Sequence, residues 1–113
     1  AATPQVFIGE EDTHGTHAAG TIAGRWDGKG ITGIADSDYV KIMVLKVLES
    51  EEGKGSSENV KAAIRYAEAN GAEICNLSIG ASEYDPELDE LMGDSRMLFV
   101  VSAGERSQPR LRI

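Results

Sequence analysis

Three short apolar segments, separated by stretches with a helical pattern, place the tightest limit on what this chain can fold into. They cover residues 39–48, 74–79 and 97–102. Each has the length of a strand and is apolar along most of its course, which is typical of strands buried on both faces of a sheet. Such strands joined by amphipathic helices predict a parallel sheet with right-handed crossovers.

The clearest helical pattern lies between the first two apolar segments, over residues 57–70. Its apolar positions share one face, and they are Val60, Ala63, Ile64 and Ala67. Gly71 follows, where a left-handed C-terminal cap belongs. The sequence therefore predicts a helix that ends at about residue 70.

Two further helices are predicted. Asp85-Pro86 combines a capping carboxylate with proline in the first turn, and Leu88, Leu91 and Met92 then share a face. Residues 14–24 also fit a helix, which Asp12 or Thr13 could cap. The glycines in that segment lower its helix propensity, so we expect the helix to pack closely against neighbouring backbone.

The expected order is helix, then strand-helix-strand-helix-strand, an α/β fold with a parallel sheet. A chain of 113 residues forms one domain at most. In such sheets, functional groups lie beyond the carboxyl ends of the strands. We therefore expect the site in the loops at 49–56, 78–82 and 103–105.

Charge and composition exclude several classes of partner. The net charge of -8 argues against nucleic acid, because phosphate binding needs a basic surface. No apolar run approaches the ~18 residues of a membrane span, so no membrane is expected as a partner. The single cysteine, Cys75, leaves no internal disulfide and is interpreted as a small buried apolar residue.

Residues 14–24 read H-G-T-H-A-A-G-T-I-A-G. This segment resembles the histidine signature of the subtilase family of serine proteases, H-G-T-H-x-A-G-x-x-A-G, and matches every specified position. Four later segments resemble the family in the same order, at residues 44–48, 53–55, 76–80 and 100–104. The resemblance covers about residues 7–104 and implies the central part of a subtilisin-like catalytic domain.

The resemblance implies a role for particular residues. His14 would be the catalytic base, while His17 would point into the helix packing. The implied contacts to a peptide or protein substrate are Gly53, Lys54, Gly55, Ser78, Ile79 and Gly80. Because a peptide substrate can pair as an added strand, these contacts need little side-chain identity. No cofactor is required for the chemistry, calcium is possible as a structural ion, and secretion is the default localisation.

Two members of the family's catalytic triad have no counterpart here. The aspartate belongs to a D-[ST]-G strand before the histidine and the serine to a G-T-S-x-[AS] motif after it, and neither motif occurs. Ser78 and Ser102 occupy binding-strand positions and are not credible nucleophiles. The chain is thus interpreted as a protease fragment that is inactive alone, and a degenerate, inactive subtilase remains an alternative.

Residues 105–113 differ in character from residues 1–104. They contain three arginines and one acid. Glu105 stands where the family has the asparagine of the oxyanion hole, and an ionised carboxylate would repel a developing oxyanion. Our hypothesis is that this tail is outside the native reading frame, with a native basic tail as the alternative.

Three other patterns in the sequence admit a different function. Residues 28–33 match G-x-G-x-x-G, but a predicted helix precedes them and a strand follows, the reverse of a dinucleotide site. His14 and His17 at helical spacing, with carboxylates at residues 10–12, could form a metal-binding domain instead. The acidic residues at 49–52 and 83–90 could bind calcium, although a solvated face explains them better.

Overall fold

The computed structural model describes residues 13–48, 56–79 and 84–102. It divides into two compact units, Ala1–Lys54 and Gly55–Ile113, which are described separately. The element order is α1, α2, β1, α3, β2, so helices accompany a small parallel sheet and the predicted α/β class is confirmed. No helix in the described ranges is long and apolar enough to cross a membrane.

The first unit contains one helix, α1 (His14–Ala23), at the predicted place. Thr13 is its N-cap residue, but its side chain makes no capping hydrogen bond. The expected close packing occurs at the end of α1, since a Cβ on Gly24 would lie 2.5 Å from the carbonyl oxygen of Ile31. Residues 28–33 form a loop, as predicted.

The strand predicted over residues 39–48 is not formed, and this prediction was wrong. The segment has no regular secondary structure, and its apolar side chains are largely exposed, with Tyr39 88% exposed. A strand requires a neighbouring strand to accept and donate its backbone hydrogen bonds. Within the described residues, the sheet contains β1 and β2 alone. Apolar composition indicates a tendency to be buried, but it does not supply that partner.

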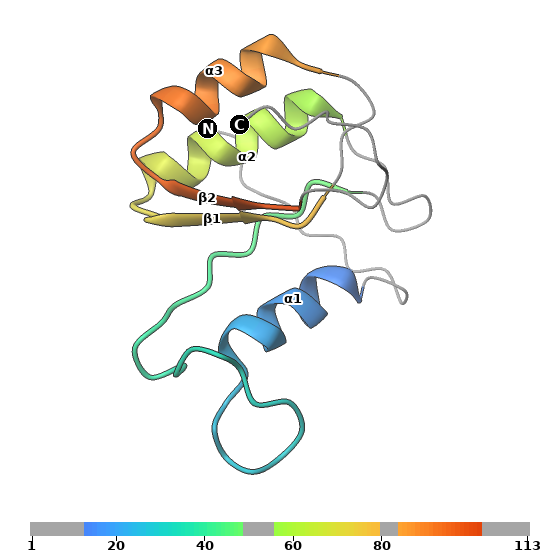
Figure 1. Ribbon diagram of the computed structural model, residues 1–113, viewed down its shortest axis with the longest axis vertical. Helices are drawn as coiled ribbons and strands as arrows, with labels where there is room; N and C mark the ends of the chain where they lie inside the picture. The colour runs from blue at the N-terminus through green and yellow to red at the C-terminus, as the bar shows by residue number, and fades with distance from the viewer. Residues whose placement is uncertain (1–12, 49–55, 80–83, 103–113) are drawn as a thin grey trace. The chain divides into compact units, whose positions relative to one another are not determined.

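The second unit holds the sheet, formed by β1 (Ile74–Leu77) and β2 (Leu98–Val101). The strands are parallel, with Ile74 opposite Leu98 and Leu77 opposite Val101. The helices α2 (Ser57–Ala69) and α3 (Pro86–Asp94) lie on one face of this sheet (Figure 1). The unit is therefore a helix-on-sheet layer with the parallel strand pairing that the sequence predicted.

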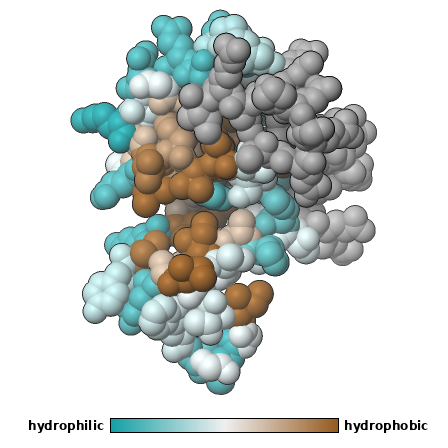
Figure 2. Space-filling model, in the orientation of Figure 1, coloured by the Kyte–Doolittle hydropathy of each residue, from teal (hydrophilic) through white to brown (hydrophobic). Residues whose placement is uncertain are grey.

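The core of the second unit lies between α2 and the sheet. Its buried apolar side chains are Val60, Ile64, Ala67 and Met97. Along both strands, half-buried positions alternate with exposed ones, so the part of the chain that the structure describes covers one face of the sheet. The opposite face carries the exposed apolar side chains of Ile74, Leu98 and Val100, and Figure 2 shows apolar surface around the strands.

The ends of α2 and α3 follow from specific residues. The Ser56 hydroxyl accepts a hydrogen bond from the Asn59 amide at the start of α2. At its end, the Gly71 and Ala72 amides donate to the carbonyl oxygens of Glu68 and Ala67, a Schellman motif with Gly71 at φ +84°. The predicted C-terminal cap is thus confirmed.

Replacing Gly71 by alanine is expected to destabilise the second unit by about 1–2 kcal/mol, because a Cβ strains the left-handed conformation. Thermal unfolding followed by circular dichroism would measure the loss. Gly93→Ala is the matched control, since Gly93 lies in α3, outside the left-handed region, with no atom within 4 Å of a new Cβ. An equal loss in both variants would contradict this account of the cap.

Candidate active site

His14 is the first residue of α1 and is exposed. The turn that carries it closes through a 2.8 Å hydrogen bond from the His17 amide to the Thr13 carbonyl oxygen. A Cβ on the following glycine, Gly15, would meet no other atom within 4 Å, so the first turn is uncrowded. An imidazole at this position can accept a proton from a neighbouring group and later return it.

The far end of α1 is held by the loop that follows it. The amides of Gly33, Ile34 and Ala35 donate to the carbonyl oxygens of Gly24, Thr21 and Ile22, at distances of 3.0, 2.9 and 2.8 Å. The Trp26 Nε1–H donates to the Gly33 carbonyl oxygen at 2.8 Å and closes the loop. These bonds satisfy carbonyl groups that a helix end leaves without partners, and they fix the helix that carries His14.

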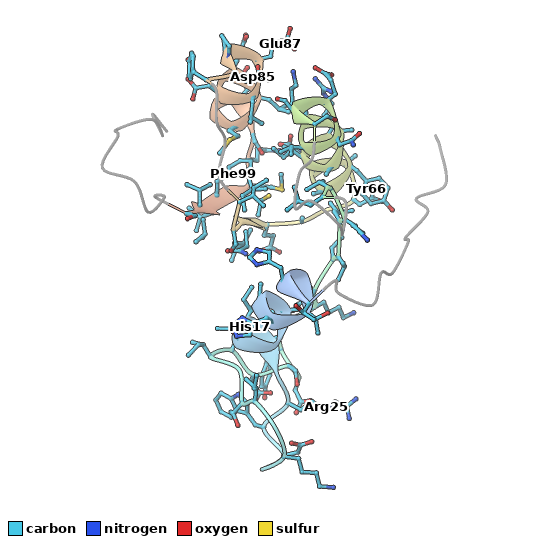
Figure 3. The ribbon with its side chains drawn as sticks, turned by 90° about the vertical axis from the view of Figure 1, so that its right-hand side faces the viewer. His17, Arg25, Tyr66, Asp85, Glu87 and Phe99 are labelled. Carbon is cyan, nitrogen blue, oxygen red and sulfur yellow. The ribbon has the colours of Figure 1, made fainter. Side chains whose placement is uncertain are left out.

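The structure does not support the expected burial of His17. Its side chain is exposed (Figure 3). The half-buried residues of α1 begin at Ala18, because the loop that covers the helix within its unit contacts its C-terminal half. The family resemblance therefore did not predict which side of α1 is covered within this unit.

The second part of the candidate site is the carboxyl edge of the sheet. Ser78 and Ile79 directly follow β1, and Ser102 directly follows β2. The Ser102 amide donates to the Leu77 carbonyl oxygen at 3.2 Å, which extends the strand pairing to this edge. The Ser78 side chain is exposed, and its hydroxyl accepts a 2.9 Å hydrogen bond from the side-chain Nδ2 of Asn76. The structure thus places Ser78 and Ile79 where parallel sheets present functional groups.

The other edge of β1 has no neighbouring strand among the described residues. An unpaired strand edge is a template for an added peptide strand. Gly53, Lys54, Gly55, Gly80 and Glu105, together with the tail 105–113, lie outside the described residues. Their assigned roles stay predictions.

Sequence reasoning missed a buried charged residue in α2. The Lys61 side chain is only 3% exposed, and its ammonium group lies 2.8 Å from Glu58, 2.9 Å from Glu87 and 3.2 Å from Asp85. Contacts with Glu58, and then with Glu87, raise the pKa of Lys61 well above its usual range. Only the i, i+3 spacing of Glu58 and Lys61 was available as a signal, and it indicates a surface ion pair.

The carboxylates around Lys61 do not fit a calcium site. Calcium takes six to eight oxygen ligands, whereas Asp85 and Glu87 already face the Lys61 ammonium. Within the described ranges, no group of three or more His, Cys, Asp or Glu side chains could hold a metal ion. The carboxylates at residues 10–12, which the metal-binding alternative needs, lie outside those ranges.

Cys75 lies in β1 and is half-buried. Burial raises the pKa of its thiol, which keeps the reactive thiolate scarce at neutral pH. Its environment agrees with the interpretation of Cys75 as a small apolar residue of the sheet.

Comparison with known families decides the relationship that the histidine signature suggested. The family model described as the subtilase family, peptidase S8, matches residues 2–112. The chain belongs to the subtilase family. The match includes α1 with its histidine signature and both strands of the sheet.

Several curated relatives of this subtilase chain are serine proteases by name. It is 35% identical to the major intracellular serine protease of Bacillus subtilis over 86% of the chain and 31% of that protein. It is 33% identical to subtilisin BL of Lederbergia lenta, over 83% of the chain and 35% of that protein. The chain thus spans about a third of the length of these relatives. No solved structure matches it.

Proposed function

We propose that this subtilase chain is part of a serine endopeptidase in which His14 is the catalytic base. The observation that carries the proposal is the complete histidine signature at residues 14–24, which begins at the exposed first residue of α1. Family membership and the names of the relatives support the same reaction class.

The proposed chemistry explains why a histidine is needed. A serine hydroxyl is a weak nucleophile until an imidazole takes its proton as the hydroxyl oxygen attacks the peptide carbonyl carbon. His14 then returns that proton to the leaving amine when the peptide bond breaks, which leaves an acyl-enzyme ester. Water hydrolyses the ester by the same proton transfers. The serine, and the aspartate that orients the imidazole, would come from outside these 113 residues.

The proposed substrate is an extended peptide or protein segment. Ser78, Ile79 and Gly80 would form one side of the binding groove, and the segment 53–55 the other. The edge of β1 that has no neighbouring strand among the described residues supports strand addition, because it offers main-chain groups. The proposed chemistry requires no cofactor, and calcium would act only as a structural ion.

A specific observation favours a second candidate, a catalytically inactive remnant. Glu105 stands at the position where the family has an oxyanion-hole asparagine. A carboxylate there would oppose the charge that develops on the carbonyl oxygen. Such a remnant could still bind extended peptides, but it would not cleave them.

The test compares the 113-residue chain with the polypeptide encoded by the complete reading frame that contains it. We expect that polypeptide to hydrolyse peptides and to be labelled by a serine-directed fluorophosphonate. His14→Ala should abolish turnover, because no other group then accepts the serine proton. His17→Ala is the matched control on the same helix and should retain most of the activity. The isolated chain should show neither turnover nor labelling.

Two outcomes would contradict the protease proposal. Equal activity of the His14→Ala and unsubstituted polypeptides would remove His14 from the mechanism. A reading frame that encodes neither the aspartate nor the serine motif, with no labelling, would establish the inactive remnant instead. Labelling of the isolated chain would show that the nucleophile lies within these 113 residues.

A further inference from the structure

The N-terminal ends of α2 and α3 are joined by a cluster of polar side chains around Lys61. Asp85 and Glu87 lie at the start of α3 (Figure 3) and contact the Lys61 ammonium at 3.2 and 2.9 Å. The Ser57 hydroxyl of α2 donates to the same Asp85 carboxylate. Polar contacts therefore cross from α2 to α3 at one end of the helix pair.

Lys61 makes this junction sensitive to charge. Its side chain is buried, so its ammonium group has lost most of its water and depends on carboxylate partners. A buried charge that loses a partner destabilises the arrangement that buries it. Glu58 lies on Lys61's own helix, so only Asp85 and Glu87 transmit this dependence to α3.

Asp85 also starts α3. One oxygen of its carboxylate accepts from the amides of Glu87 and Leu88, at 3.0 and 3.3 Å. The other oxygen faces Ser57 and Lys61. No residue of α3 is fully buried, so its packing on the rest of the unit is partial. The carboxylate that caps α3 is thus the one that fastens it to α2.

We propose that Lys61 and Asp85 form an acid-sensitive latch, in which the ionised Asp85 holds α3 against α2 and its protonation releases α3. On protonation the cap loses its negative charge, and with it the ion pair to Lys61. The rest of the second unit remains folded, because its core residues lie in α2 and beside β2. This inference is independent of the proposed protease activity.

The pH range in which the latch opens follows from the pKa of the Asp85 carboxyl group. The pKa of Asp85 is lowered from 3.8 to about 2, chiefly by the hydrogen bond from Ser57. Burial opposes this shift, whereas the Leu88 amide and Lys61 add to it. A carboxyl with a depressed pKa stabilises the fold above its unfolded pKa, and this stabilisation is lost as the pH falls through the folded pKa. The latch therefore opens between pH 3.8 and about 2.

Among the described residues of these helices, Asp85 is the one charged group that both caps α3 and pairs with Lys61. Glu58 and Glu87 also face Lys61, but neither caps α3. Asp89 accepts a 2.9 Å hydrogen bond from the Tyr84 hydroxyl within the α3 region. Lys61 keeps its charge throughout the acid range because its pKa is raised.

The latch can be tested by NMR on the ¹⁵N-labelled chain, with amide exchange followed from about pH 6 to about pH 2 and corrected for intrinsic rates. We expect protection of the α3 amides to fall about tenfold more than that of the α2 amides. Asp85→Asn keeps a capping oxygen but has no charge. It should lower α3 protection at neutral pH and remove the acid-dependent step.

Lys61→Met removes the positive charge but keeps an unbranched side chain. Arg65→Met, at an exposed position of the same helix, is its control. Lys61→Met should loosen α3 at neutral pH, whereas Arg65→Met should not. Loss of α2 and α3 protection at the same pH would overturn the proposal, as would an unchanged acid step in Asp85→Asn. If Lys61→Met fails to fold, the pH titration of the unsubstituted chain and of Asp85→Asn still tests whether protonation of Asp85 releases α3.

Discussion

Replacing Ile64 by alanine is expected to destabilise the second unit by about 2–5 kcal/mol. Ile64 is only 1% exposed and is the one large side chain that is fully buried among the described residues. Its loss removes apolar contacts and leaves a cavity beneath the sheet. A unit of this size has a total stability of only about 3–9 kcal/mol at typical values per residue. The variant should therefore be partly or wholly unfolded at room temperature.

Urea unfolding followed by far-ultraviolet circular dichroism would measure this loss. Ile74→Ala is the control with the same chemical change, because Ile74 is 63% exposed on the uncovered face of the sheet. It should lower the free energy of unfolding by less than about 1 kcal/mol. Similar losses in both variants would mean that the core does not lie between α2 and the sheet.

Replacing Gly33 by alanine is expected to disrupt the first unit. A Cβ at this position would meet the backbone nitrogen of Gly24 and lie 2.7 Å from the nitrogen and Cα of Ala23. These are backbone atoms, so they cannot yield as the end of a flexible side chain does. We expect a cost of about 1–3 kcal/mol or more from overpacking. The hydrogen bonds from Gly33 to Gly24 and from Ile34 to Thr21 should weaken as well.

The single tryptophan offers a specific probe for this prediction. Trp26 donates to the Gly33 carbonyl oxygen, so its fluorescence reports on the loop that closes α1. The matched control is Gly20→Ala inside α1, where a new Cβ meets no atom within 4 Å. That variant should stabilise the helix by about 0.5–1 kcal/mol. A stable Gly33→Ala variant with unchanged Trp26 fluorescence would refute the close approach of Gly33 to the backbone of Ala23 and Gly24.

The helices were the most predictable part of this protein. The apolar spacing of α2, with Gly71 after it, predicted both the buried face and the end of the helix, and Asp85-Pro86 predicted the start of α3. Helical hydrogen bonds join residues four apart, so the information lies within one segment of chain. The position of His14 at the start of α1 followed from the same kind of local signal.

The errors concern interactions between distant segments. Residues 39–48 have the composition of a strand, yet they form none, because a strand depends on a partner that composition does not specify. The family resemblance implied that His17 would point into the helix packing, but it did not reveal which side of α1 the loop covers. Each mistaken prediction concerned which segments would come together.

The sequence by itself determined the family, the α/β class, the helix limits and the position of the candidate base, because these depend on motifs and on short-range periodicity. Only the tertiary structure decided which face of the sheet is covered and why a lysine in α2 is buried. Lys61 has no apolar signal, and its carboxylate partners Asp85 and Glu87 lie in another helix. Burying its charge is favourable only after folding has brought α3 beside α2.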